Sequence, residues 1–412
     1  MQDKSNKRKI LNISGLLLLI AIFVIPVTYS PFNRDASAEI SYHPEQTDDY
    51  NLAKIIHRQK IRSIDSFLQA HHKRFNFQGN VLVAYKGDKI YEGSFGCSNP
   101  RKNDSLEKDA VFQLASVSKQ FTAVAALKAI EKGLFQYQDS VTRFFPNFPY
   151  EGVTVRMLLN HTAGLPNYMW LLEHYWQGER IPDNTDVMRL LAKHKLNLHF
   201  RPGTRFGYSN TGYVVLASII EKASGMRFNQ YMQQEIFKPL EMDKSFVKSA
   251  AYPAEDKEHL DGYKYWGHRY RKVPATVNDG AVGDKGIYST IEDLYKWDQA
   301  LYENKLVSAQ TMKKAYEPLK LKNGNTYPYG YGFRLKEVDG EKVAYHYGKW
   351  NGFRTGIIRY IEDTSTIIIL GHTDRPYNSR ITGNIQALLQ QEKNENGMPQ
   401  EDNTQMAAGN PG

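Results

Sequence analysis

The sequence has very little cysteine and no large excess of one charge. Its one cysteine, Cys97, excludes an intrachain disulfide and any CxxC redox or metal site. The formal net charge of the 412 residues is +9, and the first 38 residues contribute +3, from five Lys/Arg and two Asp. The remaining +6 is small for a chain of this length, so we expect no nucleic-acid partner.

The N-terminus carries the pattern of an export signal. Four basic residues between positions 4 and 9 precede a mostly apolar run from Ile10 to Tyr29, and the small residues Ala36-Ser37-Ala38 follow. This order is typical of a secretory signal peptide. The run is also long enough to cross a bilayer, although Pro26 weakens that interpretation. Residues 1–38 are therefore a cleaved signal or a membrane anchor, and in either case the basic residues stay inside and the rest of the chain is exported.

The remainder predicts one catalytic-sized unit over residues 60–391. Residues 39–59 are expected to be a polar linker and the start of a first helix that covers about 53–72, and residues 392–412 to be a disordered tail. Strand patterns near both ends predict hairpins around 86–88 and 362–365, and a helical pattern closes the unit at 381–389. The sequence therefore predicts an α/β (α+β) fold, in which the N- and C-terminal parts form one antiparallel sheet flanked by helices around an inserted, mostly helical region.

A first candidate motif is Ser116-Val117-Ser118-Lys119, which stands before strong helix-forming sequence. Residues i and i+3 share a helix face, so Lys119 can take a proton from Ser116 and turn a weak nucleophile into a reactive one. Ser116 alone could equally be a helix N-cap. Ser245-Phe246-Val247-Lys248 repeats the pattern, but no helix follows it, and we interpret it as a surface turn.

Two further motifs offer proton transfer and substrate binding. Tyr208-Ser209-Asn210 precedes a helical pattern; a Tyr beside a Lys can move protons, and Asn210 can bind a substrate amide. His346-Tyr347-Gly348 lies in β-rich sequence, where Gly348 lets substrate backbone approach and the next N–H, of Lys349, can serve an oxyanion hole. Similar triplets at 302–304 and 322–324 are interpreted as helix packing and a polar turn.

These motifs, taken in order, resemble the penicillin-recognising serine hydrolases, which include class C β-lactamases, D-alanyl-D-alanine carboxypeptidases and related esterases. The resemblance covers about residues 60–391 and includes Leu158-Leu-Asn-His-Thr-Ala-Gly-Leu-Pro166 and the stretches 200–242 and 283–297. His161, within the first of these, is expected to be a structural hydrogen-bonding residue rather than a catalytic one.

The resemblance implies a role for each matching residue. Ser116 is similar to the acylated nucleophile, Lys119 to its base or proton relay, and Tyr208 to the general base for leaving-group protonation and deacylation. Asn210 would hold the substrate amide, His346 takes the place of a usual Lys, and the N–H groups of Ser116 and Lys349 would form the oxyanion hole. No metal or other cofactor is implied. The substrate would be a small molecule or peptide, with peptidoglycan as a candidate, and the protein would be periplasmic or anchored on the outer side of a bacterial cytoplasmic membrane.

Two departures affect the expected substrate. A Lys would be a fixed cation for a substrate carboxylate, whereas His346 is mostly neutral near pH 7. Tyr347 replaces a small hydroxyl residue. Both changes disfavour efficient β-lactam hydrolysis and favour peptidase, amidase or esterase activity. The alternative to an enzyme is a binding or sensing module on the same scaffold, which β-lactams or peptides acylate slowly or not at all.

The segment Tyr263 to Lys272 is both basic and aromatic. Such sequences can stack on bases or sugars, but an exported protein has no access to nucleic acid. The segment is therefore interpreted as a solvated loop or hairpin, with a cleft wall that contacts glycan or peptide as the alternative.

Overall fold

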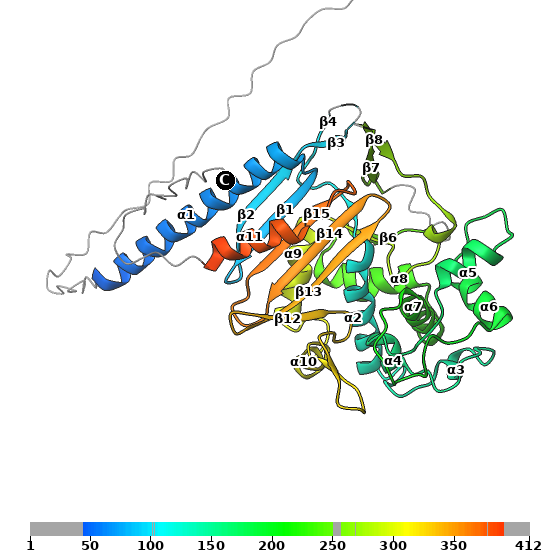
Figure 1. Cartoon of the computed structure of the whole chain (residues 1–412). Coiled ribbons are helices and arrows are strands. Elements are labelled where there is room, and N and C mark those ends of the chain that lie inside the picture. The colour runs from blue at the N-terminus through cyan, green and yellow to red at the C-terminus, as the bar shows by residue number, and fades with distance from the viewer. Residues whose placement is uncertain are drawn as a thin grey trace, which may run out of the picture. The chain divides into compact units, whose positions relative to one another are not determined.

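A six-stranded antiparallel sheet joins the two ends of the catalytic unit in the computed structural model (Figure 1). The structure describes residues 44–100, 102, 104–249, 257–267, 269–376 and 378–390. The strand order is β12-β13-β14-β15-β1-β2, so β1, near the N-terminus, pairs with β15, near the C-terminus, from Gly79↔Gly371 to Ala84↔Thr366. The bounds are β1 Gly79–Tyr85, β2 Asp88–Phe95, β12 Arg334–Val338, β13 Glu341–Trp350, β14 Phe353–Tyr360 and β15 Thr366–Gly371.

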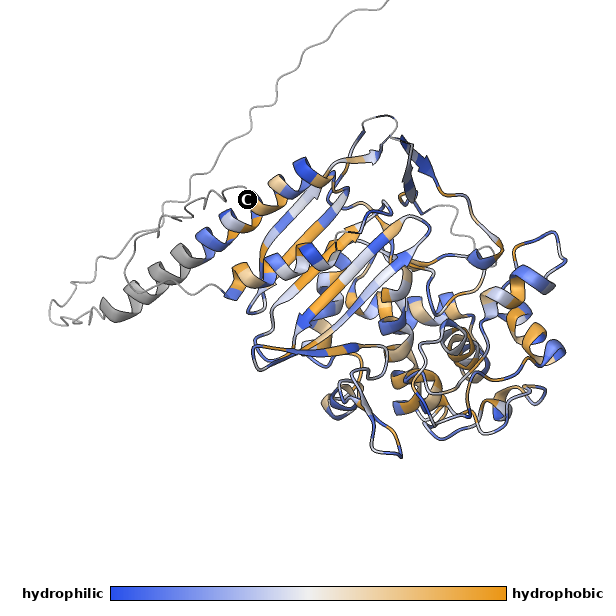
Figure 2. Cartoon of the chain, in the orientation of Figure 1, coloured by the Kyte–Doolittle hydropathy of each residue, from blue (hydrophilic) through white to orange (hydrophobic). Residues whose placement is uncertain are grey.

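Both faces of this sheet are covered, because the central strands are apolar at consecutive positions and successive side chains point to opposite faces. Val81, Val83, Ile367 and Ile369 pack on one face with residues of the helices α1 (Pro44–Phe75) and α11 (Asn378–Gln390). Leu82, Ile368 and Leu370, from the same strands, join the larger core on the other face. Figure 2 shows the apolar stretches of these strands and of the helices that cover them.

The mostly helical region is inserted between the two parts of the sheet. Its first helix, α2, is buried along most of its length and supplies Lys119 to the site. The bounds of α2 are Ser118–Glu131. The remaining described helices are α3 Val141–Phe144, α4 Val155–Leu159, α5 Tyr168–Tyr175, α6 Asn184–His194, α7 Asn210–Ser224, α8 Phe228–Met232, α9 Ile291–Tyr302 and α10 Ala309–Ala315. The short helical turns are η1 Ala115–Val117, η2 Gln233–Phe237, η3 Lys238–Leu240 and η4 Val277–Asp279.

Small sheets attach to this frame. The three-stranded one, β5-β9-β6, brings together segments on both sides of the helical insertion. The bounds of the short strands are β3 Cys97–Asn99, β4 Asp104–Ser105, β5 Phe112–Gln113, β6 Phe246–Val247, β7 Tyr263–Trp266, β8 Arg269–Lys272, β9 Ile287–Ser289, β10 Leu319–Lys320 and β11 Thr326–Tyr327.

The structure confirms the predicted hairpins and closing helix, and it corrects two details. The first helix begins at Pro44, so it replaces part of the expected linker. The second Ser-x-x-Lys segment is not a surface turn: Ser245 is buried and its hydroxyl donates to Asp293 Oδ2 (2.8 Å), while Phe246 and Val247 form the buried strand β6. The aromatic segment is the β7–β8 hairpin, in which Trp266 is exposed.

The predicted export segment, residues 1–38, and the expected tail, residues 392–412, lie outside the described residues. Among the helices that the structure does describe, none has both the length and the apolar character needed to cross a bilayer.

Candidate active site

Ser116 lies in the turn η1, which leads directly into α2 and is anchored on two sides. The Leu114 N–H donates to the Ile287 carbonyl (2.8 Å), and the Thr355 hydroxyl donates to the Leu114 carbonyl (2.6 Å). Ala115 has φ +50°, a conformation that is costly for a residue with a side chain and is common at functional sites. The turn therefore holds Ser116 on a fixed, strained backbone between β9 and β14.

The Lys119 side chain is buried and turned toward Ser116. Its Nζ donates to Ser116 Oγ (3.1 Å) and to the Asp284 carbonyl (2.9 Å). The same nitrogen lies 5.0 Å from the ring centroid of Tyr208 and 5.7 Å from that of Tyr213. The two bonds fix the amine against the nucleophile, within direct proton-transfer distance.

Tyr208 is 37% exposed, and its ring packs against the buried His161. The ring centroids of Tyr208 and His161 are 4.4 Å apart, and His161 Nδ1 accepts a hydrogen bond from the Ser209 N–H (3.1 Å). Burial, followed by the nearby Lys119 charge, holds the pKa of His161 well below its usual value, so the imidazole is neutral and keeps this acceptor. His161 thus has the structural hydrogen-bonding place expected from the sequence and acts as a positioning residue for Tyr208.

His161→Leu is therefore expected to lower kcat about 100-fold with a smaller change in KM, because the Ser209 amide loses its acceptor and Tyr208 loses its support. His161→Asn is the matched control, since its amide oxygen can replace Nδ1 and Asn tolerates the φ of +61° found there. Steady-state kinetics of both variants test this. Equal losses in the two variants would show that the acceptor does not matter.

Asn210 starts α7, which Ser209 caps by accepting from the Gly212 N–H (3.2 Å). The Asn210 Oδ1 atom is buried without a hydrogen-bond partner among the described residues. An unpaired buried amide oxygen is costly, so an incoming donor such as a substrate N–H would satisfy it.

His346, predicted from the sequence to bind substrate, is buried, at 1% exposure. Its Nδ1–H donates to the Tyr347 carbonyl (2.8 Å), which leaves Nε2 as the acceptor facing the Tyr329 hydroxyl (3.4 Å). Burial, together with the Lys119 and Arg334 charges, lowers the pKa of His346 to about 3. The imidazole is neutral, as the sequence predicts, and it supports Tyr329 and Tyr208 rather than supplying a cation.

The end of β13 offers an open edge beside the nucleophile. β12 pairs with residues 341–345 of β13, so residues 346–350 have no strand partner on that side among the described residues. Asn351 and Gly352 both have positive φ, which is typical of a two-residue type I′ hairpin turn, and Trp350↔Phe353 is then the hydrogen-bonded pair. Alternation makes Lys349↔Arg354 a non-hydrogen-bonded pair, so the Lys349 N–H points to the open edge.

Gly348 lets this edge approach η1. A side-chain carbon on Gly348 would lie 2.4 Å from the Leu114 carbonyl oxygen and 3.0 Å from Ala115 Cβ. The close packing of the nucleophile turn therefore requires a glycine at this position, and its predicted role in substrate approach stays a prediction. The Ser116 N–H belongs to the first turn of a helix, whose amides lack internal acceptors, so two N–H groups are available for an oxyanion.

Tyr347 lies on the opposite face of β13 and does not reach the site. Its hydroxyl shares a hydrogen bond with the Thr382 hydroxyl of α11 (2.8 Å). The replacement of a small residue by Tyr347 is thus accommodated by packing behind the sheet.

The sequence analysis missed Arg334, the first residue of β12. Its guanidinium lies 5.2 Å from the ring centroid of Tyr208, and it has no acidic partner among the described residues. Only the folded sheet brings Arg334 beside residues 126 positions away in the chain, and no local pattern marks it. The described residues include no group of three His, Cys, Asp or Glu side chains placed to hold a metal.

Comparisons with known proteins show the family of the chain. The beta-lactamase family matches residues 64–392. Penicillin-binding protein 4* of Bacillus subtilis (strain 168) is 37% identical over 328 residues, which cover 77% of this chain and 73% of that protein. A D-aminopeptidase of Brucella anthropi is 26% identical, over 71% of this chain and 55% of that protein.

A solved structure shares the architecture. The octameric penicillin-binding protein homologue from Pyrococcus abyssi superposes with a TM-score of 0.69 at 26% identity, over 80% of this chain and 77% of that chain. A buried lysine bonded to a serine on a helix-initiating turn, beside an open strand edge, is the arrangement of an acyl-transfer site. The chain belongs to the beta-lactamase family and is a serine hydrolase of that family.

Proposed function

We propose that this protein is an exported hydrolase whose Ser116 is acylated by peptides that end in a D-alanine-type residue with a free carboxylate, and by β-lactams. The observation that carries the choice is Arg334, whose guanidinium lies beside Tyr208 with no acidic partner in the part of the chain that the structure describes. His346 is neutral, so Arg334 is the cation placed to bind a substrate carboxylate, and a planar guanidinium suits that group. The relatives include a penicillin-binding protein, which supports the same class of acyl donor.

The proposed cycle uses groups described above. Ser116 Oγ attacks the carbonyl carbon, and its proton passes to Lys119, which keeps it or hands it on to Tyr208. The oxyanion that forms accepts hydrogen bonds from the Ser116 and Lys349 N–H groups. The carbonyl–nitrogen bond then breaks and the leaving amine receives a proton through Tyr208. Water attacks the resulting ester, releases the acid and returns the proton to Ser116 Oγ.

Arg334→Gln is expected to raise KM about tenfold for peptides with a free C-terminal carboxylate and to leave KM for neutral p-nitrophenyl esters unchanged, because only the former use the guanidinium. Arg334→Lys keeps the charge but not the planar pair of donors. Its KM for the carboxylate peptides should lie between those of the unmodified protein and of Arg334→Gln. A parallel rise of KM for both substrates would mean that Arg334 acts by supporting Tyr208 rather than by binding the carboxylate.

The direct test is to incubate the purified protein with benzylpenicillin, and separately with an N-acylated D-Ala-D-Ala peptide. Intact protein mass, remaining drug and released D-alanine are followed over time. A lasting adduct on Ser116 together with D-alanine release supports the proposal. A lasting adduct without release indicates a binding or sensing module, and rapid drug loss without an adduct indicates a β-lactamase. If neither substrate reacts, the proposal is wrong, and p-nitrophenyl esters and D-amino-acid amides test the esterase and amidase alternatives.

A further inference from the structure

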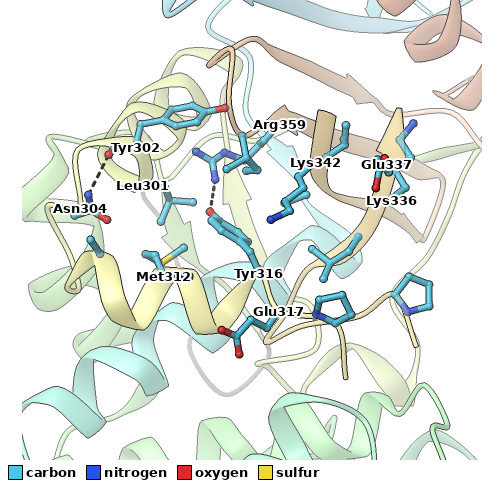
Figure 3. Close-up of a pocket in the computed structure, with 18 residues that line it drawn as sticks. Leu301, Tyr302, Asn304, Met312, Tyr316, Glu317, Lys336, Glu337, Lys342 and Arg359 are labelled. Atoms are coloured by element: carbon cyan, nitrogen blue, oxygen red, sulfur yellow. Dashed lines mark hydrogen bonds between the residues drawn. The ribbon is translucent and has the colours of Figure 1, made fainter. Parts of the chain in front are cut away.

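A cavity of about 570 Å³ lies between the sheet edge and the helices α9 and α10. Its walls come from the ends of these helices, from β12, β13 and β14, and from two prolines, Pro318 and Pro328 (Figure 3). None of the candidate catalytic or substrate-binding residues lines it. Its volume lies within the range of about 300–1,000 Å³ that is usual for small-molecule sites.

The floor of this cavity is apolar. Leu301, Met312 and Ala344 are all buried and belong to the larger core. Arg359 is the charged group in the wall, and it is already neutralised: its Nε donates to Asp298 Oδ1 (2.5 Å) and its Nη1 donates to the Tyr316 hydroxyl. The deep part of the cavity therefore favours an apolar group and leaves no unpaired charge for a ligand to meet.

The rim is charged. Lys313 and Lys342 line it together with Glu317 and Glu337, and all four are exposed. No salt bridge joins any of them to a partner within the described residues. Lys336 is also part of the lining, but its ammonium group lies 5.6 Å from the ring centroid of Tyr345, on the opposite face of the β12–β13 ladder. Figure 3 shows the Lys342 side chain extending into the cavity toward Tyr316 and Arg359.

We propose that this cavity binds an amphipathic anion, with an aliphatic chain on the apolar floor and a carboxylate or phosphate group at Lys342. The chain matches the apolar lining, and the head group supplies a counter-charge to the Lys342 ammonium group. Glu337, which pairs with Lys342 across the β12–β13 ladder, is the group that opposes such a ligand.

Titration of the full-length protein with dodecanoate, below its critical micelle concentration and followed by calorimetry, tests the site. One saturable site per chain is expected. Dodecyl phosphate distinguishes a phosphate from a carboxylate head group, since the tighter of the two identifies the preferred anion. Dodecyltrimethylammonium, which has the same chain and the opposite charge, should bind at least about tenfold more weakly. Equal binding of all three, or several weak sites, would overturn the proposal.

Variants test where the ligand binds, and each has an expected effect on the affinity for dodecanoate. Lys342→Glu should weaken dodecanoate binding about tenfold, and Glu337→Gln should strengthen it about two- to threefold, as expected for charges at an exposed rim. Met312→Trp fills the floor and should abolish binding; if it fails to fold, Ala309→Phe narrows the mouth instead. Lys320→Glu, on β10 and outside the lining, is the matched control and should change nothing. Unchanged affinity in Lys342→Glu and in both filling variants would place the ligand elsewhere and refute the assignment.

Discussion

Replacement of Lys119 by Met is expected to slow acylation of Ser116 by benzylpenicillin about 10²–10⁴-fold, the usual contribution of a positioned acid–base group. The Lys119 amine is the group that bonds to Ser116 Oγ, and the Asp284 carbonyl holds it there. Met keeps the length and the packing in this buried position, so the variant removes proton transfer with little loss of volume. Intact-mass kinetics of adduct formation measure the effect.

The second Ser-x-x-Lys segment provides a matched control within the same molecule. Lys248 contacts His259 Nε2 (2.6 Å) rather than a serine, and Ser245 is bonded within the core. Lys248→Met should therefore be acylated at the unmodified rate, and Ser116→Ala should form no adduct. Full-rate acylation of Lys119→Met would show that another group accepts the serine proton.

Acidification from pH 6.5 to pH 4 is expected to destabilise the fold strongly, because three imidazoles are buried in their neutral form. Burial lowers the pKa of His346 to about 3 and that of His372 to about 4, and it holds the pKa of His161 well below its usual value. Unfolded histidine titrates near pH 6.5, so below that pH the unfolded chain binds protons that the folded chain does not. The free energy of unfolding then falls by about 1.4 kcal/mol per pH unit for each imidazole, until the folded pKa is reached.

Urea unfolding at several pH values measures this slope. His346→Asn removes one titrating group while its amide can still donate to the Tyr347 carbonyl, so the slope between pH 6 and 4 should decrease by about 1.4 kcal/mol per pH unit. His199→Asn, which changes an exposed histidine, should leave the slope unaltered. An unchanged slope in His346→Asn would mean that this imidazole is protonated within the fold.

Much of the fold follows from patterns that are local in the sequence. The short β-rich runs at 81–84 and 366–370, next to turn residues, predict the two hairpins that meet as β1 and β15, and the residues before α2 predict the contact of Ser116 with Lys119, one turn apart on a helix. These relations need no long-range information, since spacing along a strand or helix fixes which side chains share a face.

The remaining features depend on contacts between distant segments. His346 looks like a substrate-binding residue in the chain, but Tyr329 and Tyr208 cover it in the fold. Gly348 looks like a place for substrate approach, yet the Leu114 carbonyl occupies that space. Ser245 looks exposed because Pro239 precedes it, but the partner that buries it, Asp293, is 48 residues away. Burial by a distant segment leaves no local signal, and this is why these interpretations required the structure.

The β1–β15 ladder also constrains the order in which the chain can fold. Gly79 pairs with Gly371, so the central pair of strands closes only after nearly the whole unit has been made. Closing such a long loop slows folding, because the conformational entropy of the loop is lost before the strand pairing stabilises the fold. A chain that ends before Thr366 has no inner partner for β1, and it leaves the Thr355 and Lys349 side of the site without its neighbouring strand. During synthesis the nucleophile is therefore present long before it can be active, and a molecule that crosses a membrane before it folds would gain activity only on the far side.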